Sequence, residues 1–391
     1  MDSFGLVRRV LRKLHLWVAM ALFVPLVALG LSGSILVYRS EIAALLDPPP
    51  KLLLAQGAPH GVAAMLHAAE ARLGGGFLPY LYTPPPARGQ PALIRLFTPP
   101  RAGVRRQIVT VRIDPVSLDL VAWDDAPLPG FLSPVLALHG NLLMGRAGRP
   151  YVGWLGVAML GLGISGLVLW WPRRGRWGAA FTVKRGARGL RLWRDLHGAI
   201  GIWTLALFVT VTASGVYFAF PDTVAAGIRA LLPSREPAAQ PPVPIAAGGR
   251  TIDADAAIAA ALSATPRARL IALGLPTRPG QPYRVSLAHP GDAQGAPAIV
   301  VQVDPGSGAV IARSDPARFA PAQALLAWQR TLHFGVGLGG LWRALVCLTG
   351  LLPALFAFTG IAMWLLRRQA RRRSDRRRAR KESLASDSPS G

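Results

Sequence analysis

Long apolar runs without charge alternate along the chain with longer segments of mixed polarity. Four runs contain no Asp, Glu, Lys or Arg: Leu16 to Tyr38, Tyr151 to Pro172, Gly198 to Phe220 and Leu345 to Leu366. Each reaches the roughly 20 apolar residues that a helix needs to cross a bilayer. The composition agrees, since 51% of the residues are hydrophobic and only 16% are charged. We therefore predict four transmembrane helices.

The two mixed segments, 39–150 and 221–344, share a second pattern, in which a helix is followed by short strands. Apolar residues at helical spacing predict helices over 59–73 and 253–263, the second capped by Thr251 or Asp253. Alternating apolar residues predict strands near 77–83, 91–98, 106–113 and 118–123, and again near 268–275, 281–288, 297–304 and 309–313. Since a helix over a small antiparallel sheet is an α+β module, each mixed segment is expected to form one.

The basic residues are concentrated in the short segments between the apolar runs. Of the 44 Lys and Arg, four lie in residues 1–14, eight in 173–195 and ten in 367–391. Short segments rich in Lys and Arg stay in the cytoplasm, which places both termini inside and both mixed segments outside. The net charge of +25 could suggest nucleic-acid binding. The basic tail has no interleaved aromatic residues, however, so we expect it to contact anionic lipid of the bilayer and expect no nucleic acid as partner.

The predicted fold is a membrane α-helical protein with four transmembrane helices, duplicated as two plus two, and two periplasmic α+β modules. In order, we expect a cytoplasmic N-terminus (1–14), a first span (15–38), a first module (39–150), a second span (151–172), a cytoplasmic loop (173–197), a third span (198–220), a second module (221–344), a fourth span (345–366) and a basic cytoplasmic tail (367–391). The first span follows basic residues, as in a signal peptide. Its internal copy at 194–220 cannot be a cleaved leader, so we expect the first span to be retained.

Two kinds of unit occur twice in the sequence, and each contains a histidine before an apolar run. Arg12, Leu14-His15 and Ser32-Gly33 return 182 residues later as Arg194, Leu196-His197 and Ser214-Gly215. The second unit returns at an offset of 194: His139, Gly145, Arg149, Gly156, Ser165-Gly166, Trp170 and Arg173-Arg174 match His333, Gly339, Arg343, Gly350, Thr359-Gly360, Trp364 and Arg367-Arg368. Ser133-Pro134 predicts the start of a short helix that carries His139. The topology puts His15 and His197 at the inner face, and His139 and His333 at the outer face.

A single histidine at a membrane interface is often only a polar cap. Four histidines in a matched pattern instead indicate a common ligand. Zinc and copper sites need three or four protein ligands, and neither pair has a cysteine or a repeated carboxylate nearby. Cys347 is the one cysteine, which excludes disulfides, Cys-ligated clusters and c-type haem. Haem provides four nitrogens itself and needs one or two axial ligands. We therefore predict two b-type haems, one held by each pair.

Haem propionates need cationic partners, and each unit supplies an arginine. Arg12 and Arg194 lie three residues before their histidines, on the same helix face. Arg149 and Arg343 lie ten residues after theirs, in glycine-rich connections from which a side chain can reach back. Because arginine can bond both oxygens of a carboxylate, these four are the candidate cofactor-binding residues. The repeated Ser/Thr-Gly pairs are interpreted as positions of close helix packing.

Three motifs carry a family resemblance. They are Leu14-His15 with Ser32-Gly33, the run Leu138-His139-Gly140-Asn141-Leu142-Leu143 with Ser165-Gly166, and Trp170-Trp171-Pro172-Arg173-Arg174. In these motifs the chain resembles the PepSY-associated transmembrane family of bacterial inner-membrane proteins. The run Val303-Asp304-Pro305-Gly306-Ser307-Gly308 looks like part of a PepSY domain, whereas Pro115-Val116-Ser117-Leu118 in the first module lacks that glycine turn.

Some members of this family are di-haem reductases of ferric siderophores. The resemblance implies that His15 and His197 ligate an inner haem, and that His139 and His333 ligate an outer one. It also implies an oxidoreductase that takes electrons from a separate cytoplasmic or quinol donor and reduces a periplasmic ferric siderophore or other ferric chelate. Two alternatives stay open: a b-type cytochrome with another periplasmic acceptor, and a non-redox scaffold whose PepSY-like modules bind a partner protein or peptide.

Overall fold

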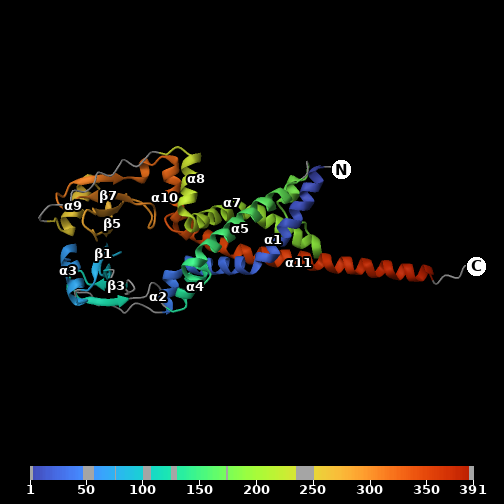
Figure 1. Ribbon diagram of the computed structural model, residues 1–391, viewed down its shortest axis with the longest axis horizontal. Coiled ribbons are helices and arrows are strands. Elements are labelled where there is room, and N and C mark those ends of the chain that lie inside the picture. Colours follow the sequence, from blue (N-terminus) through green and yellow to red (C-terminus); the bar gives the residue numbers. More distant parts are fainter. Residues whose placement is uncertain are drawn as a thin grey trace, which may run out of the picture.

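Four long helices form an elongated bundle with a β-sheet at one end and both chain termini at the other (Figure 1). The computed structural model describes residues 3–46, 57–74, 76–99, 107–124, 130–172, 175–234 and 251–386. Arg173-Arg174 of the repeated motif therefore lies outside the described residues. We refer to the end of the bundle next to the sheet as the sheet side and to the opposite end as the tail side.

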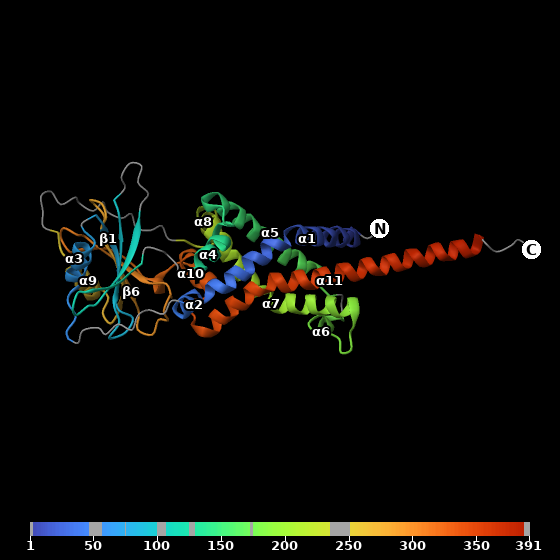
Figure 2. The ribbon, with the colours of Figure 1, turned by 90° about the horizontal axis from the view of Figure 1, so that it is seen from below.

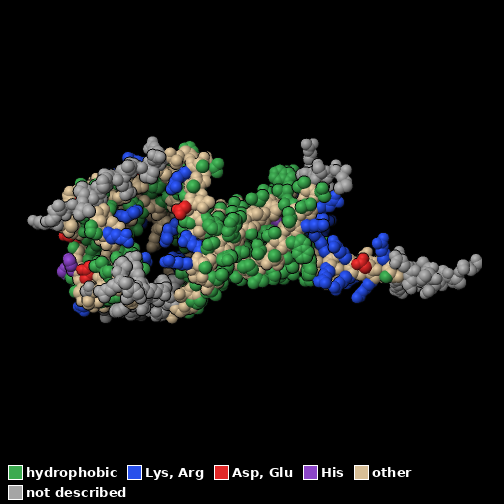
Figure 3. Space-filling view, viewed as in Figure 1, with side chains coloured by type: hydrophobic (Ala, Val, Ile, Leu, Met, Phe, Trp, Pro, Cys, Tyr) green, Lys and Arg blue, Asp and Glu red, His purple; other side chains and the backbone are tan. Residues whose placement is uncertain are grey.

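The long helices are α1 (Ser3–Val37), α5 (Gly148–Trp170), α7 (Gly189–Ala219) and α11 (Gly339–Ser386). The stretches long and apolar enough to cross a membrane are Gly5–Val37, Gly145–Trp170, Gly189–Ala219 and Gly339–Arg376. Hydrophobic side chains cover the outside of the bundle, and Lys and Arg border this belt on the tail side (Figure 3). Because such a surface is unfavourable in water and long enough to match a bilayer, the chain is a multi-pass membrane protein.

The first and last long helices cross closely at two glycines. A Cβ atom added at Gly30 of α1 or at Gly350 of α11 would overlap the backbone carbonyl of the other glycine. Next to this crossing, Ser34 Oγ donates a hydrogen bond to the Cys347 carbonyl at 2.7 Å. Small residues allow helix backbones to approach in this way. The contact joins the two halves of the duplication, since α1 belongs to the first half and α11 to the second.

Eight strands within the described residues form one antiparallel sheet, whereas the sequence pattern predicted two modules with a small sheet each. The strands are β1 (Leu78–Thr83), β2 (Ala92–Phe97), β3 (Ile108–Ile113), β4 (Leu120–Asp124), β5 (Arg269–Gly274), β6 (Tyr283–Ala288), β7 (Ile299–Val303) and β8 (Val310–Ser314). Their order is β4-β3-β2-β1-β5-β6-β7-β8. At the junction Leu81 pairs with Gly274 and Tyr82 with Leu273. Each module covers an open edge of the other, which removes two exposed edges.

Two helices cover the face of the sheet that points away from the bundle (Figures 1 and 2). They are α3 (Val62–Arg72) and α9 (Ala254–Ala264). Every second residue of the inner strands is buried against them, including Ile94, Val111 and Val285, which are fully buried. The alternation that predicted the strands therefore also indicates which face of the sheet packs on the helices. The other face points toward the bundle.

Aspartates at the start of α9 cap both helices. Asp253, one of the two N-cap residues that the sequence predicted, is the N-cap and accepts a hydrogen bond from Ala256 N at 2.8 Å. Asp255, from the second module, accepts hydrogen bonds from Val62 N at 2.7 Å and Ala63 N at 2.9 Å at the start of α3 in the first module. The carboxylate thus satisfies free N–H groups of a helix that has no side-chain cap of its own.

Short helices connect the sheet with the bundle. They are α2 (Arg39–Leu46), α4 (Leu132–Asn141), η1 (Gly145–Ala147), α8 (Pro221–Leu231), η2 (Pro316–Arg318) and α10 (Pro321–Phe334). A further short helix, α6 (Trp177–Ala180), lies on the tail side between α5 and α7 (Figure 2). The predicted start of α4 at Ser133-Pro134 is wrong. Phe131 already has a right-handed helical backbone, so the helix begins at Leu132 and Ser133 lies within its first turn. Helices α4 and α10 directly precede the spans of α5 and α11.

Candidate cofactor site: two histidine pairs

The tail-side pair consists of His15 on α1 and His197 on α7. Their ring centroids are 6.5 Å apart and the ring planes are inclined by 78°. Phe356 of α11 packs against His197 with a centroid distance of 5.1 Å. The two histidines come from equivalent positions of the two halves, so the pair crosses the duplication.

The sheet-side pair consists of His139 on α4 and His333 on α10. Their ring centroids are 6.0 Å apart and the planes are inclined by 36°. Burial lowers the pKa of both imidazoles, and the neighbouring His139 helps to bring the pKa of His333 to about 4. Both rings are therefore neutral at pH 7, which is the form that binds metals.

Backbone carbonyls hold the sheet-side histidines. His139 Nδ1 lies 2.9 Å from the Leu29 carbonyl of α1, and His333 Nδ1 lies 3.1 Å from the Val211 carbonyl of α7. A carbonyl only accepts, so Nδ1 must carry the proton and Nε2 must be unprotonated in the neutral rings. Ser32 Oγ is a second, longer neighbour of His139 Nδ1 at 3.4 Å. Ser214 Oγ occupies the same place beside His333 at 3.3 Å.

Hydroxyl groups hold the tail-side histidines instead. His15 Nδ1 lies 2.8 Å from Ser165 Oγ of α5, and His197 Nδ1 lies 2.7 Å from Thr359 Oγ1 of α11. Both hydroxyls donate their own proton to a carbonyl one turn earlier in their helix. Each hydroxyl must therefore accept from the histidine, so that Nδ1 is again the donor. Within the described ranges, no protein group is hydrogen-bonded to Nε2 of any of the four rings.

The glycine after each hydroxyl residue makes room for a ring on the sheet side. A Cβ atom at Gly33 would lie 2.8 Å from His139 Cε1, and one at Gly215 would lie 3.0 Å from His333 Cε1. On the tail side the space is wider, since a Cβ at Gly166 would be 3.6 Å from His15 and one at Gly360 would meet nothing within 4 Å. We call these Ser/Thr-Gly pairs the histidine seats, because the hydroxyl of each lies beside the Nδ1 atom of one of the four histidines. The sequence pattern predicted only close helix packing at these positions. The sequence feature that could have indicated this role is that the Ser/Thr-Gly pairs repeat at the same offsets as the histidines.

The four rings fit axial ligation of haem in distance and protonation. Two imidazoles on opposite sides of one metal, each bonded at about 2.0 Å, have ring centres about 6 Å apart. An Nδ1–H that donates to the protein while Nε2 remains available is the usual arrangement of a metal-binding histidine. No group of three or more His, Cys, Asp or Glu that could hold a metal ion occurs among the described residues. The pairs therefore suit a cofactor that brings most of its ligands itself.

A cavity of about 370 Å³ adjoins the sheet-side pair. It is lined mainly by apolar groups of the long helices, and both His139 and His333 border it. Gly33 and Gly215 line its walls, so the missing side chains of the seats contribute to the space. An apolar cavity with few polar groups is the expected shape of a cofactor site.

The two sheet-side arginines predicted for propionates differ in position. Arg149 borders the cavity, and its Nε donates to the Phe218 carbonyl at 3.0 Å. Arg343 is turned toward the end of α1 instead. Its guanidinium donates to the Val37 carbonyl at 2.8 Å and forms an ion pair with Glu41. Arg39, which lies outside the repeated motifs, borders the cavity in its place.

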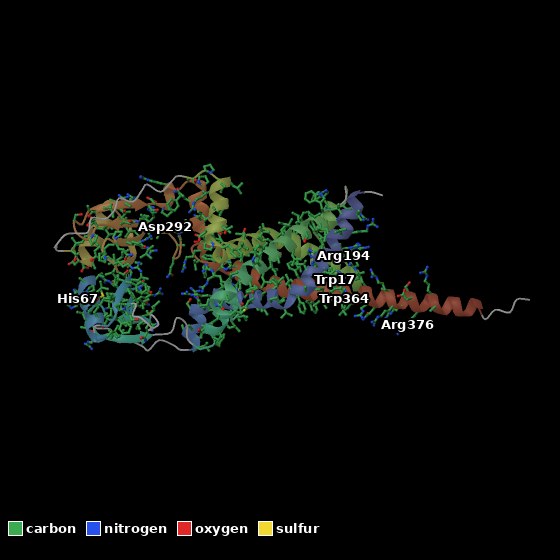
Figure 4. The ribbon with its side chains drawn as sticks, in the orientation of Figure 1. Trp17, His67, Arg194, Asp292, Trp364 and Arg376 are labelled. Carbon is green, nitrogen blue, oxygen red and sulfur yellow. The ribbon has the colours of Figure 1, made fainter. Side chains whose placement is uncertain are left out.

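The two tail-side arginines lie at the end of the bundle, where the basic residues gather. Arg194 pairs with its neighbour Asp195 at 3.1 Å and is exposed. Arg12 and Arg194 are both close enough to Arg367 of α11 to repel its charge. Figure 4 labels Arg194 on this side of the bundle.

The three other histidines are separate from the pairs. His67 lies at the far tip of the sheet region, with 83% of its side chain exposed (Figure 4). His60 is also exposed, while His289 is hydrogen-bonded to Asp315 at 3.1 Å.

Comparisons with known proteins agree with the resemblance. The model of the family described as "PepSY-associated TM region" matches residues 12–367. An uncharacterized protein of Pseudomonas aeruginosa, PA4219, is 30% identical over 283 residues. The match covers 61% of this chain and 64% of that protein, so the chain spans less than two thirds of the relative's length.

Proposed function

Because this chain belongs to the PepSY-associated transmembrane family, we propose that its histidine pairs hold two b-type haems and that it carries electrons across a bacterial inner membrane. The observation that carries the proposal is the double pairing: centroid distances of 6.5 and 6.0 Å in two sites, each made of one histidine from either half. Haem, when bound, supplies one-electron oxidation and reduction without a change in its protein ligands.

The side chains around the pairs have distinct tasks in this proposal. The seats orient each imidazole and direct its unprotonated Nε2 toward the cofactor. Apolar residues of the four helices exclude water from the cofactor faces. Arg149 and Arg39 are placed to neutralise carboxylates on the sheet side, and Arg12 and Arg194 on the tail side. Arg343 ties α11 to the end of α1.

The proposed direction of electron transfer rests on the sidedness that the charge distribution favours. The basic segments at the tail side favour the cytoplasm for this end, so that the sheet lies in the periplasm. Electrons from a separate cytoplasmic or quinol donor would then enter at the site of His15 and His197, and they would leave for a ferric chelate at the site of His139 and His333. Reduction of Fe³⁺ to Fe²⁺ would release iron, because Fe²⁺ binds hard-oxygen siderophores weakly.

Haem content and the visible spectrum of the purified full chain test this proposal. We expect two haems per chain and a reduced-minus-oxidised spectrum of six-coordinate b-type haem. The chelate is tested separately, by following reduction of a ferric siderophore after the haems have been reduced. A colourless, haem-free preparation from haem-replete cells would rule out the reductase. It would favour a scaffold in which the PepSY-like modules bind a partner.

A further inference from the structure

A hollow lies between the sheet and the sheet-side ends of the helices, and Lys and Arg side chains gather around it (Figure 3). Its far wall is the open face of the sheet, since α3 and α9 cover the opposite face (Figures 1 and 2). Two hydrogen bonds hold the sheet at this place. Gly337 N donates to the Gln294 carbonyl at 3.0 Å, and Thr331 Oγ1 donates to the Gly295 carbonyl at 3.2 Å.

The sheet wall of the hollow carries three arginines. Arg95, Arg112 and Arg284 each stand between two buried core residues of their strand, so the alternation of a strand directs them to the open face. In the part of the chain that the structure describes, none of the three forms an ion pair. Three cations without carboxylates therefore face the helix ends.

Strand pairing fixes the spacing of two of these arginines. Arg95 is opposite Leu81, Leu81 is opposite Gly274, and Gly274 is opposite Arg284. The two arginines thus lie in one row across the junction of the modules, three strand spacings or about 14 Å apart. The positions between them have one apolar side chain and none at the glycine. The sheet wall thus has an arginine at each end of this row and an uncharged surface between them.

The helix wall carries two further cations, Arg39 and Arg330, that form no ion pair with any residue the structure describes. The guanidinium groups of Arg39 and Arg330 both lie over the ring of Phe334, at 5.7 and 5.1 Å from its centroid. Burial, and then repulsion by Arg330 and Arg343, lowers the pKa of Arg39. Gathering like charges is unfavourable unless an anion offsets them. Arg39 also borders the cavity of the sheet-side histidines, so this wall joins the hollow to the proposed electron exit.

We propose that the hollow is a binding site for an anionic ferric chelate, held between Arg95 and Arg284 on the sheet and Arg39 and Arg330 on the helices. The inference specifies the substrate of the proposed reductase and so rests on that function. A bound chelate that touches both walls lies outside the bilayer, which distinguishes it from a lipid headgroup. Carboxylate or catecholate groups on the chelate would form charge-assisted hydrogen bonds with the arginines.

Gallium(III) chelates test the site without any redox step, because Ga³⁺ is not reduced under these conditions. Isothermal titration calorimetry on the full chain in neutral detergent compares a trianionic gallium tris-catecholate with a neutral gallium tris-hydroxamate. We expect the trianionic complex to bind at least roughly tenfold more tightly at low salt, and this preference to fall as salt is raised. Equal affinity for the two complexes would overturn the inference.

Substitutions then locate the site. Replacing Arg95→Gln and Arg284→Gln together should weaken binding of the trianionic complex by roughly tenfold or more, with little effect on the neutral one. Arg72→Gln is the matched control, because Arg72 lies on α3, on the other face of the sheet, and pairs with Asp119 at 3.1 Å. If the double variant does not fold, Arg330→Gln on the helix wall tests the same site, because Arg330 does not line the cavity of the sheet-side histidines. Unchanged binding by a folded variant would refute the assignment.

The charge preference in the calorimetric test and the haem content of the preparation are separate results. A haem-free preparation that still prefers the trianionic complex would support the hollow and refute the reductase. A haem-loaded preparation without charge preference would support the electron carrier and refute the hollow.

Discussion

The two histidine pairs arise from one duplication and yet are held by different groups. On the sheet side, His139 and His333 stand on short helices and bond to the backbone carbonyls of Leu29 and Val211. On the tail side, His15 and His197 stand on long membrane helices and bond to side-chain hydroxyls. A backbone acceptor cannot be removed by substitution, whereas a hydroxyl can. One pair is thus fixed by the fold and the other by two side chains.

The seats also connect the two sites within each half of the chain. His15 of α1 bonds to Ser165 of α5, while Ser32 of the same α1 lies beside His139, which precedes α5. The second half repeats this exchange between α7 and the α10–α11 unit. The hydroxyl contacts of the histidines therefore stay within one half, but each pair takes one ring from either half. A shift of one half against the other would change both pairs together.

The largest expected effect is loss of one centre on removal of a ligand. His15→Ala and His197→Ala should each abolish or alter the same spectral component, since the two rings share a site. His139→Ala and His333→Ala should affect the other component. About half of the haem should remain in each variant, as measured by pyridine haemochrome and difference spectra. If His15→Ala and His139→Ala affected the same component, the proposed pairing would be wrong.

A His60→Ala or His67→Ala variant is the control for these losses. Both residues are exposed in the sheet region and take no part in the pairs. Their spectra should match that of the unaltered chain.

Removal of the hydroxyls should distinguish the two sides. Ser165→Ala and Thr359→Ala leave Nδ1 of a tail-side histidine without its acceptor, so we expect a roughly tenfold or larger loss of haem affinity and a shifted midpoint potential. Ser32→Ala and Ser214→Ala should have much smaller effects, because the carbonyls of Leu29 and Val211 remain. Haem dissociation and potentiometric titration measure both properties. Similar effects on the two sides would show that hydroxyls are equally important to both pairs.

An added methyl group should affect the sheet-side pair more strongly than the tail-side pair. Gly33→Ala and Gly215→Ala bring a Cβ to about 3 Å from a sheet-side ring, so the histidine must move and the sheet-side spectrum should change. Gly360→Ala on the tail side meets nothing within 4 Å and should be nearly silent. The prediction fails if Gly360→Ala perturbs its site as strongly as Gly33→Ala does.

Local patterns predicted the elements well because each pattern reports a local contact. The strands lie within two residues of their predicted positions, since alternation records which side chains meet α3 and α9. The union of the two modules was not predicted. Pairing of β1 with β5 depends on backbone groups and on the separation of the two halves in space, and neither leaves a periodic signal. The repeat offsets did indicate which histidines come together.

Two arginines at matched positions of the repeat make different contacts in the structure. Arg149 and Arg343 occupy matched positions, so equal roles were expected. The offset of 182 that relates α1 to α7 puts Thr223 at the position equivalent to Glu41. Among the described residues, Arg343 therefore forms an ion pair and Arg149 does not, and Arg149 borders the cavity. The divergence depends on one acidic residue that lies outside every repeated motif.

The smallest expected effect concerns this acidic residue. The hydrogen bonds from Arg343 lower the pKa of Glu41 to about 2, from an ordinary value of 4.5. A carboxyl group with a lowered pKa stabilises the fold above its unfolded pKa, and the contribution is lost as the pH falls toward the folded value. Since the Glu41 side chain is 48% exposed, solvent screening limits the effect of Glu41→Gln to less than about 1 kcal/mol.

The variant should melt slightly below the unaltered chain at pH 7, and the difference should shrink between about pH 4.5 and pH 2. Glu70→Gln, which removes a carboxylate of α3 that has no arginine partner within the described residues, is the control variant. Thermal unfolding in detergent at several pH values measures both variants, and a difference that grew on acidification would contradict the ion pair.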